Sequence, residues 1–248
     1  MIVCLTGMHR SGTSLMGNFL HRCGISMGKE LIGAARGNRF GHFEDAEFVS
    51  FHCKLLNRRG CHMYSPARNL EFTDQEARQA QALIEQRQRD FGNWGWKDPR
   101  TTLFLGSWHR IIPEVRYIFL YRSPHSVIDS LLRRATDRRL KMAPWLAASA
   151  WIRYNEDIIS FYKTHKAQAL LVNIHGFNHD HASSVNLLED WLGIELPVSY
   201  TDVYHPSELK TAPAGQRRLT SRLIDKVYGK RMDEIYRTLE SLAAIRGG

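Results

Sequence analysis

The sequence predicts an α/β fold of three layers, in which helices flank both faces of a central parallel sheet. Short apolar runs typical of buried strands alternate with longer segments of helical periodicity, which is the pattern of a parallel sheet. A glycine-rich loop follows the first apolar run directly and joins it to a helix. With 248 residues, 43% of them hydrophobic and 24% charged, the composition is typical of a folded domain, and we expect a single domain over residues 1–248.

The first half of the chain carries clear signals for the ends of its elements. Gly24 ends the first helix, and Pro113 ends the helix before the third strand. Thr73 and Glu76 form a capping box, which predicts the start of a polar helix. We expect strands over residues 2–5, 94–97 and 115–121, and helices over residues 14–23, 44–56, 73–91 and 101–112.

The second half continues the alternation of strands and helices. Pro124 fits the first turn of a helix, Pro144 opens a long helix, and Gly193 closes a later one. Residues 28–42 and 197–217 show little periodicity, so we expect loops there. We expect helices over residues 124–134, 144–164 and 183–192, a strand over residues 170–174, and a last helix from residue 219.

Three segments follow predicted strands directly, namely residues 6–14, 97–100 and 122–130. Ligands of parallel sheets bind outside the carboxyl ends of the strands. The three segments therefore point into one crevice, and we expect the functional site there.

Charge, apolar runs and cysteines limit the class of protein. Lys and Arg outnumber Asp and Glu by 34 to 25, a formal net charge of +9, which favours an anionic partner. No run approaches the roughly 20 apolar residues that span a bilayer, and residues 1–5 form a predicted strand instead of a signal peptide. We expect a cytoplasmic protein with free thiols and no metal site, because CxxC spacing is absent among Cys4, Cys23, Cys53 and Cys61.

The first motif, Gly7–Ser14, is the loop between the first strand and the first helix. Its glycines let backbone N–H groups face inward, and the helix N-terminus and hydroxyl side chains add further donors, so the loop predicts a phosphate site. It resembles the nucleotide-binding loop GxxxxGK[ST], but Thr13 stands in place of the lysine, and Arg10 supplies a cation instead. That lysine reaches the outer phosphates of a triphosphate, so its absence argues against an ordinary ATPase or GTPase.

Two motifs resemble those of sulfotransferases that use 3′-phosphoadenosine 5′-phosphosulfate (PAPS). The resemblance to this family covers about residues 1–135. Gly7–Leu15 resembles their 5′-phosphosulfate loop, and Phe119–Ser130 resembles their 3′-phosphate motif. The resemblance implies a P-loop nucleotide-hydrolase-like fold, PAPS as the donor, and a grip of Arg122 and Ser130 on the 3′-phosphate. It implies that the 5′ end is held by Arg10, Ser11, Gly12, Thr13 and Ser14.

The third motif, Trp96–Arg100, resembles tyrosylprotein sulfotransferases and related bacterial sulfotransferases in its Lys-Asp-Pro sequence. The resemblance implies that Lys97 contacts the sulfonate or its bridging oxygen. Charge on the leaving phosphate needs positioned cations, and Arg10 and Lys97 offer them in place of a metal ion. Lys97 and Asp98 could instead form a structural ion pair, and we assign Asp98 no catalytic role.

The proton of an acceptor hydroxyl needs a base. In the enzymes that the third motif resembles, a Glu follows a Gly in the segment after the first helix, and Glu44 matches that pattern after Gly41. We expect Glu44 to be the base, with His42 as the second candidate, because many cytosolic sulfotransferases use a histidine. Alternatively, Glu44 and Asp45 are only acids favoured by the helix dipole.

The expected reaction is sulfonate transfer from PAPS to a hydroxyl of a small molecule, a glycan or a peptide. The alternatives are a small-metabolite kinase and a non-catalytic binder of polyanions. The second alternative would use a basic cluster that comprises Arg133, Arg134, Arg138, Arg139 and Lys141. This cluster lacks interleaved aromatic residues, so we do not expect nucleic acid as a partner.

The resemblance weakens after residue 170. Family members often carry Tyr-Glu-Asp-Leu where this chain has Asn173–Gly176, so the residues that hold adenine stay open, as do the acceptor and the oligomeric state. Further candidates for phosphate or acceptor contacts, which a solvated basic surface explains equally well, are Lys210, Arg217 and Arg218. Aromatic residues that could stack on a sugar or a phenol, although core packing is their more common role, are Tyr64, Trp108, Trp145 and Trp151.

Overall fold

The computed structural model describes residues 1–34, 41–65, 70–134, 137–206 and 219–247, and the statements below concern those residues. The strands are β1 (Ile2–Gly7), β2 (Trp94–Lys97), β3 (Arg116–Tyr121) and β4 (Ala169–Asn173). They form a sheet in the order β2-β1-β3-β4, and every pair is parallel. The predicted parallel sheet is therefore confirmed. β1 is an interior strand, and the glycine-rich loop follows it at the carboxyl edge of the sheet.

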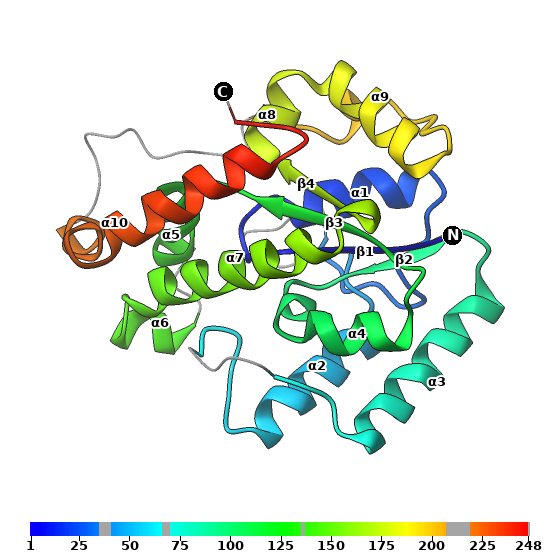
Figure 1. Cartoon of the computed structure of the whole chain (residues 1–248), viewed down its shortest axis with the longest axis horizontal. Coiled ribbons are helices and arrows are strands. Elements are labelled where there is room, and N and C mark those ends of the chain that lie inside the picture. The colour runs from blue at the N-terminus through cyan, green and yellow to red at the C-terminus, as the bar shows by residue number, and fades with distance from the viewer. Residues whose placement is uncertain (35–40, 66–69, 135–136, 207–218, 248) are drawn as a thin grey trace.

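Helices cover both faces of this sheet (Figure 1). One face carries α1 (Thr13–Arg22), α8 (Ile174–His179) and α9 (His181–Leu192). The other face carries α2 (Ala46–Arg58), α3 (Asp74–Asp90), α4 (Leu105–Ile111), α5 (Pro124–Arg134), α6 (Arg138–Met142), α7 (Leu146–Thr164) and α10 (Leu219–Leu242). The three-layer α/β architecture is confirmed.

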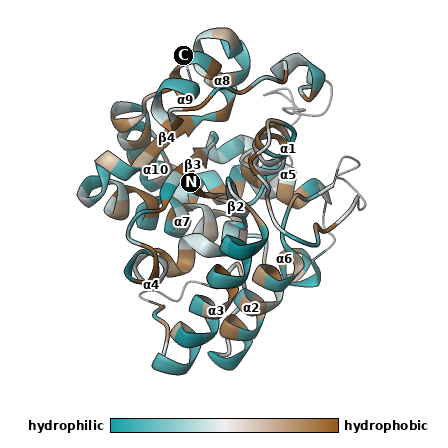
Figure 2. Cartoon of the chain, turned by 90° about the vertical axis from the view of Figure 1, so that its right-hand side faces the viewer, coloured by the Kyte–Doolittle hydropathy of each residue, from teal (hydrophilic) through white to brown (hydrophobic). Residues whose placement is uncertain are grey.

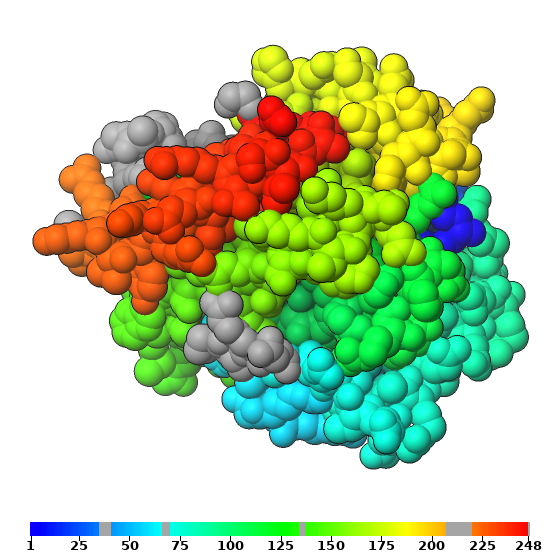
Figure 3. Space-filling view, in the orientation of Figure 1, coloured from blue at the N-terminus to red at the C-terminus, as the bar shows by residue number. Residues whose placement is uncertain are grey.

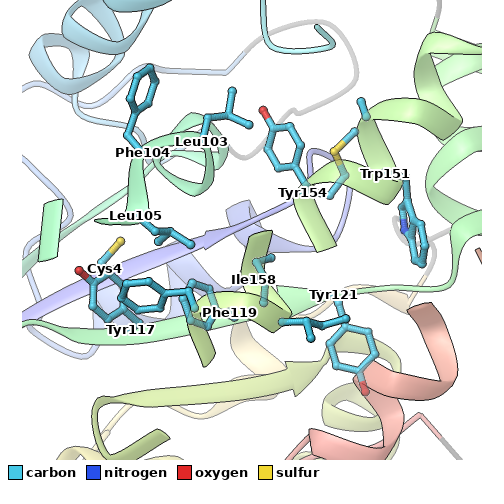
Figure 4. Close-up of a cluster of buried hydrophobic side chains, with 14 of the residues drawn as sticks. Cys4, Leu103, Phe104, Leu105, Tyr117, Phe119, Tyr121, Trp151, Tyr154 and Ile158 are labelled. Atoms are coloured by element: carbon cyan, nitrogen blue, oxygen red, sulfur yellow. The ribbon is translucent and has the colours of Figure 1, made fainter. Parts of the chain in front are cut away.

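Alternate side chains of β3 enter two separate cores, as the period of two in a strand requires. Tyr117 and Phe119 belong to the core under α7, whereas Ile118 and Leu120 belong to the core under α1. In Figure 4, Tyr117, Phe119 and the α7 residue Ile158 lie together in the first of these cores. A strand buried on both sides in this way gives the carboxyl edge of the sheet a rigid support.

The helix predicted over residues 101–112 is divided in two. Its first part is a 3-10 helix, η1 (Pro99–Phe104), and α4 follows it. The Asp98 side chain accepts a hydrogen bond from the Arg100 N–H at 2.9 Å, and Pro99 takes the first helical position. The chain therefore turns directly after β2, which keeps Asp98 and Arg100 at the carboxyl edge of the sheet.

The sequence does not predict α6 and α8. The first has only five residues, too few to show a helical period. The second begins at the last residue of β4, where the Asn173 side chain accepts a hydrogen bond from the His175 N–H at 2.8 Å. Short 3-10 turns also occur at η2 (Lys166–Gln168) and η3 (Tyr200–Asp202). The candidates Lys210, Arg217 and Arg218 lie outside the described residues.

The last helix, α10, packs along α7 and reaches α5. Figure 3 shows α10 lying across this face of the molecule, next to α7. Ser221 donates a hydrogen bond to Asp129 of α5 at 2.7 Å. Beyond α10, the Ala244 N–H donates to the Leu171 carbonyl at 3.0 Å, so the tail runs beside β4. The end of the chain thus braces α5, which carries Ser130.

Ion pairs attach α3 to its neighbours, because much of this helix is hydrophilic (Figure 2). Glu76 binds Arg59 at 2.6 Å, and this hydrogen bond lowers the pKa of Glu76 to about 2 against the opposing effect of burial. Farther along α3, the fully buried Arg87 binds Asp45. The second pair lies next to Glu44 and enters the site below.

Candidate active site

Two glycines of the loop between β1 and α1 are required by close packing against β3 and α8. Gly7 has a φ angle of 150°, and a Cβ there would lie 2.1 Å from the Leu120 carbonyl oxygen. Gly12 has a φ angle of 89°, and a Cβ there would lie 2.4 Å from the Ile174 side chain. Gly12 is the N-cap of α1 and offers no side chain to the first N–H groups of the helix. Those N–H groups can therefore bind an anion.

Ser11 adds a buried hydroxyl to this loop. Its side chain is fully buried, and its Oγ has no hydrogen-bond partner within the part of the chain that the structure describes. A buried hydroxyl without a partner is unfavourable, so a bound group that hydrogen-bonds to it would compensate the loss. Thr13 is also buried, at the first residue of α1. The residues present fit a phosphate or sulfate oxygen.

Arg10 connects the loop to α5. Its φ of 72° is uncommon for a residue with a side chain. Its Nε donates a hydrogen bond to Ser130 Oγ at 2.9 Å. This contact joins the first motif to the second, and the sequence does not predict it. Arg10 and Ser130 therefore belong to one site.

Arg122 follows β3 directly at the same edge of the sheet. Only 7% of it is exposed. Burial lowers the pKa of Arg122, and the positive charge of Arg133 adds to this effect. An anion bound beside the Arg122 guanidinium would offset both effects, because it stabilises the charged form.

Lys97 and Glu44 form a buried pair at the end of β2. The Lys97 Nζ donates to Glu44 Oε1 at 2.6 Å and to Ser14 Oγ at 3.3 Å. Burial lowers the pKa of Lys97, and the Glu44 carboxylate opposes that shift. The ion pair that the sequence allows between Lys97 and Asp98 is not formed among the described residues. Lys97 thus links the proposed base to the loop.

Glu44 and Asp45 have different surroundings, although both precede α2. Asp45 caps this helix through the Glu47 N–H at 2.9 Å and accepts two hydrogen bonds from Arg87, at 2.7 and 2.9 Å. Asp45 and Arg87 are both fully buried. Asp45 is therefore the acid that caps the N-terminus of α2, whereas the Glu44 carboxylate binds Lys97.

A cavity of about 220 Å³ opens beside Glu44. A cavity of about 150 Å³ can hold benzene, so this one accommodates a single ring. His42, the second candidate base, lines it together with Glu44. The lining residues are His9, Arg10, His42, Glu44, Met63, Tyr64, Arg100, Leu131, Asp137 and Leu140.

His9 presents a neutral ring to this cavity. It lies between Tyr64 and Tyr154, with ring centroids 6.1 and 6.0 Å away. Burial, followed by the charge of Arg100, lowers the pKa of His9 to about 3. Its Nε2 has no hydrogen-bond partner within the described ranges. The described residues thus leave one buried nitrogen of a cavity-lining ring without a hydrogen bond.

Arg100 lies between two carboxylates behind the cavity. Its Nη1 is 2.6 Å from Asp98 Oδ1 and 3.7 Å from Glu44 Oε2. The other oxygen of Asp98 is 2.8 Å from His52 Nδ1, and Trp108 Nε1 donates to His52 Nε2 at 3.0 Å. The sequence assigns no role to Arg100 or His52. For Arg100 a signal exists, since it directly follows the Lys-Asp-Pro motif, but nothing in the sequence indicates His52.

The remaining candidates divide between core and surface. Trp108 and Trp151 are fully buried, Tyr64 lines the cavity, and Trp145 is 51% exposed. Across the described ranges, no three His, Cys, Asp or Glu side chains gather in a way that could hold a metal ion. None of the helices described here combines the length and the apolar character needed to cross a bilayer.

Three solved structures share this fold at low sequence identity. The sulfotransferase domain of the Synechococcus PCC 7002 olefin synthase has a TM-score of 0.54 and 17% identity, with 97% of this chain and 94% of that chain covered. The sulfotransferase domain from the curacin biosynthetic pathway has a TM-score of 0.56 and 16% identity, with 96% of each chain covered. Sulfotransferase STF1 from Mycobacterium tuberculosis H37Rv has a TM-score of 0.53 and 13% identity, with 92% and 76% covered. These likenesses show the fold.

Sequence comparison gives the family. A search among curated proteins finds no match. The sequence model of the sulfotransferase family, however, matches residues 3–198, which include all of β1 except Ile2, the other three strands and all three motifs. This match covers most of the 248 residues. The chain therefore belongs to the sulfotransferase family.

Proposed function

We propose that this protein transfers a sulfonate group from PAPS to an acceptor hydroxyl, with Glu44 as the base. PAPS would supply the activated sulfonate. The single observation that carries the proposal is the contact of Lys97 with both Glu44 and Ser14, at 2.6 and 3.3 Å. It links a carboxylate to an anion-binding loop through one buried cation, which is the arrangement that transfer of an anionic group to a hydroxyl requires.

The donor is proposed from two groups of residues at the carboxyl edge of the sheet. The N–H groups at Gly12 and the buried Ser11 hydroxyl suit the 5′-phosphosulfate, with Arg10, Thr13 and Ser14 beside them. Arg122 and Ser130 suit the 3′-phosphate, because a buried guanidinium binds phosphate through a rigid fork of donors. The hydrogen bond from Arg10 to Ser130 supports a single ligand that spans both groups.

The chemical roles follow from the positions of the charges. Glu44 lines the cavity and would take the proton of an acceptor hydroxyl there. Lys97 and Arg10 would stabilise negative charge that develops on the leaving phosphate, as preorganised cations do in phosphoryl transfer. When the donor binds, Lys97 would divide its hydrogen bonds between Glu44 and the donor. The interaction of Lys97 with Glu44 would then be weaker.

The alternatives have less support. A kinase of a small metabolite needs a cation at the position of Thr13, and that residue is a buried threonine. A polyanion binder would use the basic cluster, of which Arg138, Arg139 and Lys141 are exposed on α6. The binding of a polyanion at this surface would not explain the buried pair of Lys97 and Glu44.

The test is an assay with sulfur-labelled PAPS and a panel of acceptors: a phenol, a monosaccharide, a tyrosine-containing peptide and a long-chain alcohol. We expect labelled product with at least one class, and no transfer from γ-labelled ATP. Glu44→Gln should lower turnover by about 100-fold or more, the usual effect of losing a general base. The matched control is Glu85→Gln, an exposed position on α3. Equal turnover of Glu44→Gln and wild type, or label from ATP alone, would contradict the proposal.

A further inference from the structure

A chain of hydrogen bonds leads from the aromatic core to Arg100, whose Nη1 lies 3.7 Å from Glu44 Oε2. Trp108 Nε1 donates to His52 Nε2 at 3.0 Å, so Nε2 is an acceptor without a hydrogen. The hydrogen of the neutral ring therefore resides on Nδ1, which donates to Asp98 Oδ2 at 2.8 Å. The side chains of His52 and Asp98 are fully buried. The proposed reaction assigns no role to this series of hydrogen bonds.

Asp98 divides its two oxygens between His52 and Arg100. Its Oδ1 accepts from the Arg100 N–H at 2.9 Å and from Arg100 Nη1 at 2.6 Å. Burial raises the pKa of Asp98, but Arg100 and then His52 outweigh that effect, so the pKa is lowered and the group is a carboxylate. Burial of a carboxylate is unfavourable unless it is fully paired, and here each oxygen has a donor.

This arrangement decides which carboxylate Arg100 contacts. Its Nη1 is 1.1 Å closer to Asp98 Oδ1 than to Glu44 Oε2, at 2.6 against 3.7 Å. A guanidinium that is free to turn can bind a carboxylate at two points. Such contact would add a second close cation to Lys97, which already donates to Glu44 at 2.6 Å, and the additional positive charge would make Glu44 a weaker base.

We propose that the buried pair of His52 and Asp98 positions the base, by holding the Arg100 guanidinium on Asp98 and away from full contact with Glu44. His52 is a positioning residue that acts through Asp98 and Arg100. Its hydrogen bond fixes Asp98 Oδ2, which leaves Oδ1 directed at Arg100. The proposal rests on the proposed function where it names Glu44 as the base, whereas its claim about Arg100 concerns only the protein.

The test is a carbon-13 NMR titration of the Glu44 carboxyl, assigned by its absence in Glu44→Gln. The groups that face Glu44 are Lys97, Arg100, Arg10, His9, His42 and Asp137, and they stay unchanged in the variants. Asp98→Asn should lower the pKa of Glu44 for two reasons, because it removes a neighbouring negative charge and releases Arg100 toward Glu44, whereas His52→Leu keeps the charge of Asp98 and isolates the second reason. His52→Leu should shift the pKa in the same direction. His52→Asn keeps a donor for Asp98 and should restore the wild-type value.

The kinetic readout separates positioning from general damage. With the best acceptor of the panel, Asp98→Asn and His52→Leu should lower kcat while KM for PAPS stays unchanged, and His52→Asn should recover kcat. An unchanged Glu44 pKa in folded His52→Leu would overturn the proposal. If Asp98→Asn does not fold, the Glu44 pKa in His52→Leu and His52→Asn tests the proposal. The titration uses neither donor nor acceptor, so a shifted pKa in a protein without transfer would contradict the proposed function alone.

Discussion

The three cations assigned to the donor come from three different elements. Arg10 lies in the loop after β1, Lys97 ends β2, and Arg122 follows β3. Each is held by backbone that the sheet fixes, so little reorganisation is needed when negative charge arrives. At the scale of single residues, the candidate site is therefore a set of preplaced positive charges, of which Lys97 binds the Glu44 carboxylate and Arg10 lines the same cavity.

His9 carries a prediction about pH. Its pKa is about 3 in the folded protein, against an ordinary value of 6.5, because of burial and then the charge of Arg100. As the pH falls from 6.5 toward 3, the unfolded chain takes up a proton at His9 and the folded chain does not, so the free energy of unfolding decreases. His9→Gln should make this decrease smaller, as measured by urea unfolding across that range.

The control for this measurement is His179→Gln, at an exposed position in α8. It should leave the pH dependence of the free energy of unfolding as in wild type. If His9→Gln and wild type lose stability in parallel as the pH falls, the neutral state of His9 in the folded protein would be wrong.

At the scale of elements, the start of α2 is held by α3. The two hydrogen bonds from Arg87 to Asp45, at 2.7 and 2.9 Å, join the two helices beside Glu44. Asp45 also accepts a hydrogen bond from the Lys29 N–H at 2.9 Å, so the segment after α1 and the start of α2 are tied to one carboxylate. This buried pair fixes the backbone from which Glu44 projects.

Loss of one partner of this pair should be costly. Arg87→Met would leave Asp45 as a buried carboxylate without its main partner, and we expect a loss of about 3–5 kcal/mol in the free energy of unfolding. The double variant with Asp45→Asn should lose less than the sum of the two single variants, because the residues interact. Arg89→Met, on the exposed side of α3, is the control. Additive effects in urea unfolding would contradict the coupling.

The sequence predicts the elements well where a local signal exists. The capping box at Thr73 is present in the structure, and Gly193 closes α9 in the left-handed conformation. The α6 helix is too short for periodicity, and the 3-10 turn η1 depends on the cap that Asp98 provides. Such features are set by individual hydrogen bonds, which a periodic pattern does not record.

The same limit applies to the candidate site. Its three motifs are local in sequence, so the loop, Lys97 and Arg122 can be predicted from strand ends. The hydrogen bonds from Arg10 to Ser130 and from His52 to Asp98 join residues that are 120 and 46 positions apart. These contacts depend on how helices pack, and the sequence pattern carries no information about them.

At the scale of the whole molecule, the parallel sheet brings three motifs to one edge. The register that pairs Gly7 with Leu120 and Leu5 with Lys97 places the ends of β1, β2 and β3 side by side. The cavity beside Glu44 opens next to Arg10 of the loop. In the proposed reaction, this edge would hold a nucleotide with two anionic groups, and the adjacent cavity would hold the acceptor.

Isothermal titration calorimetry with 3′-phosphoadenosine 5′-phosphate against 5′-AMP tests the central claim most directly. Two charge-assisted contacts at Arg122 and Ser130 should add about 3 kcal/mol, so we expect binding about 100-fold tighter for the 3′-phosphorylated nucleotide. Arg122→Met should remove most of this difference, whereas Arg116→Met, at the opposite end of β3, should keep it. Equal affinity of the wild-type protein for the two nucleotides would contradict the 3′-phosphate site and, with it, PAPS as the donor.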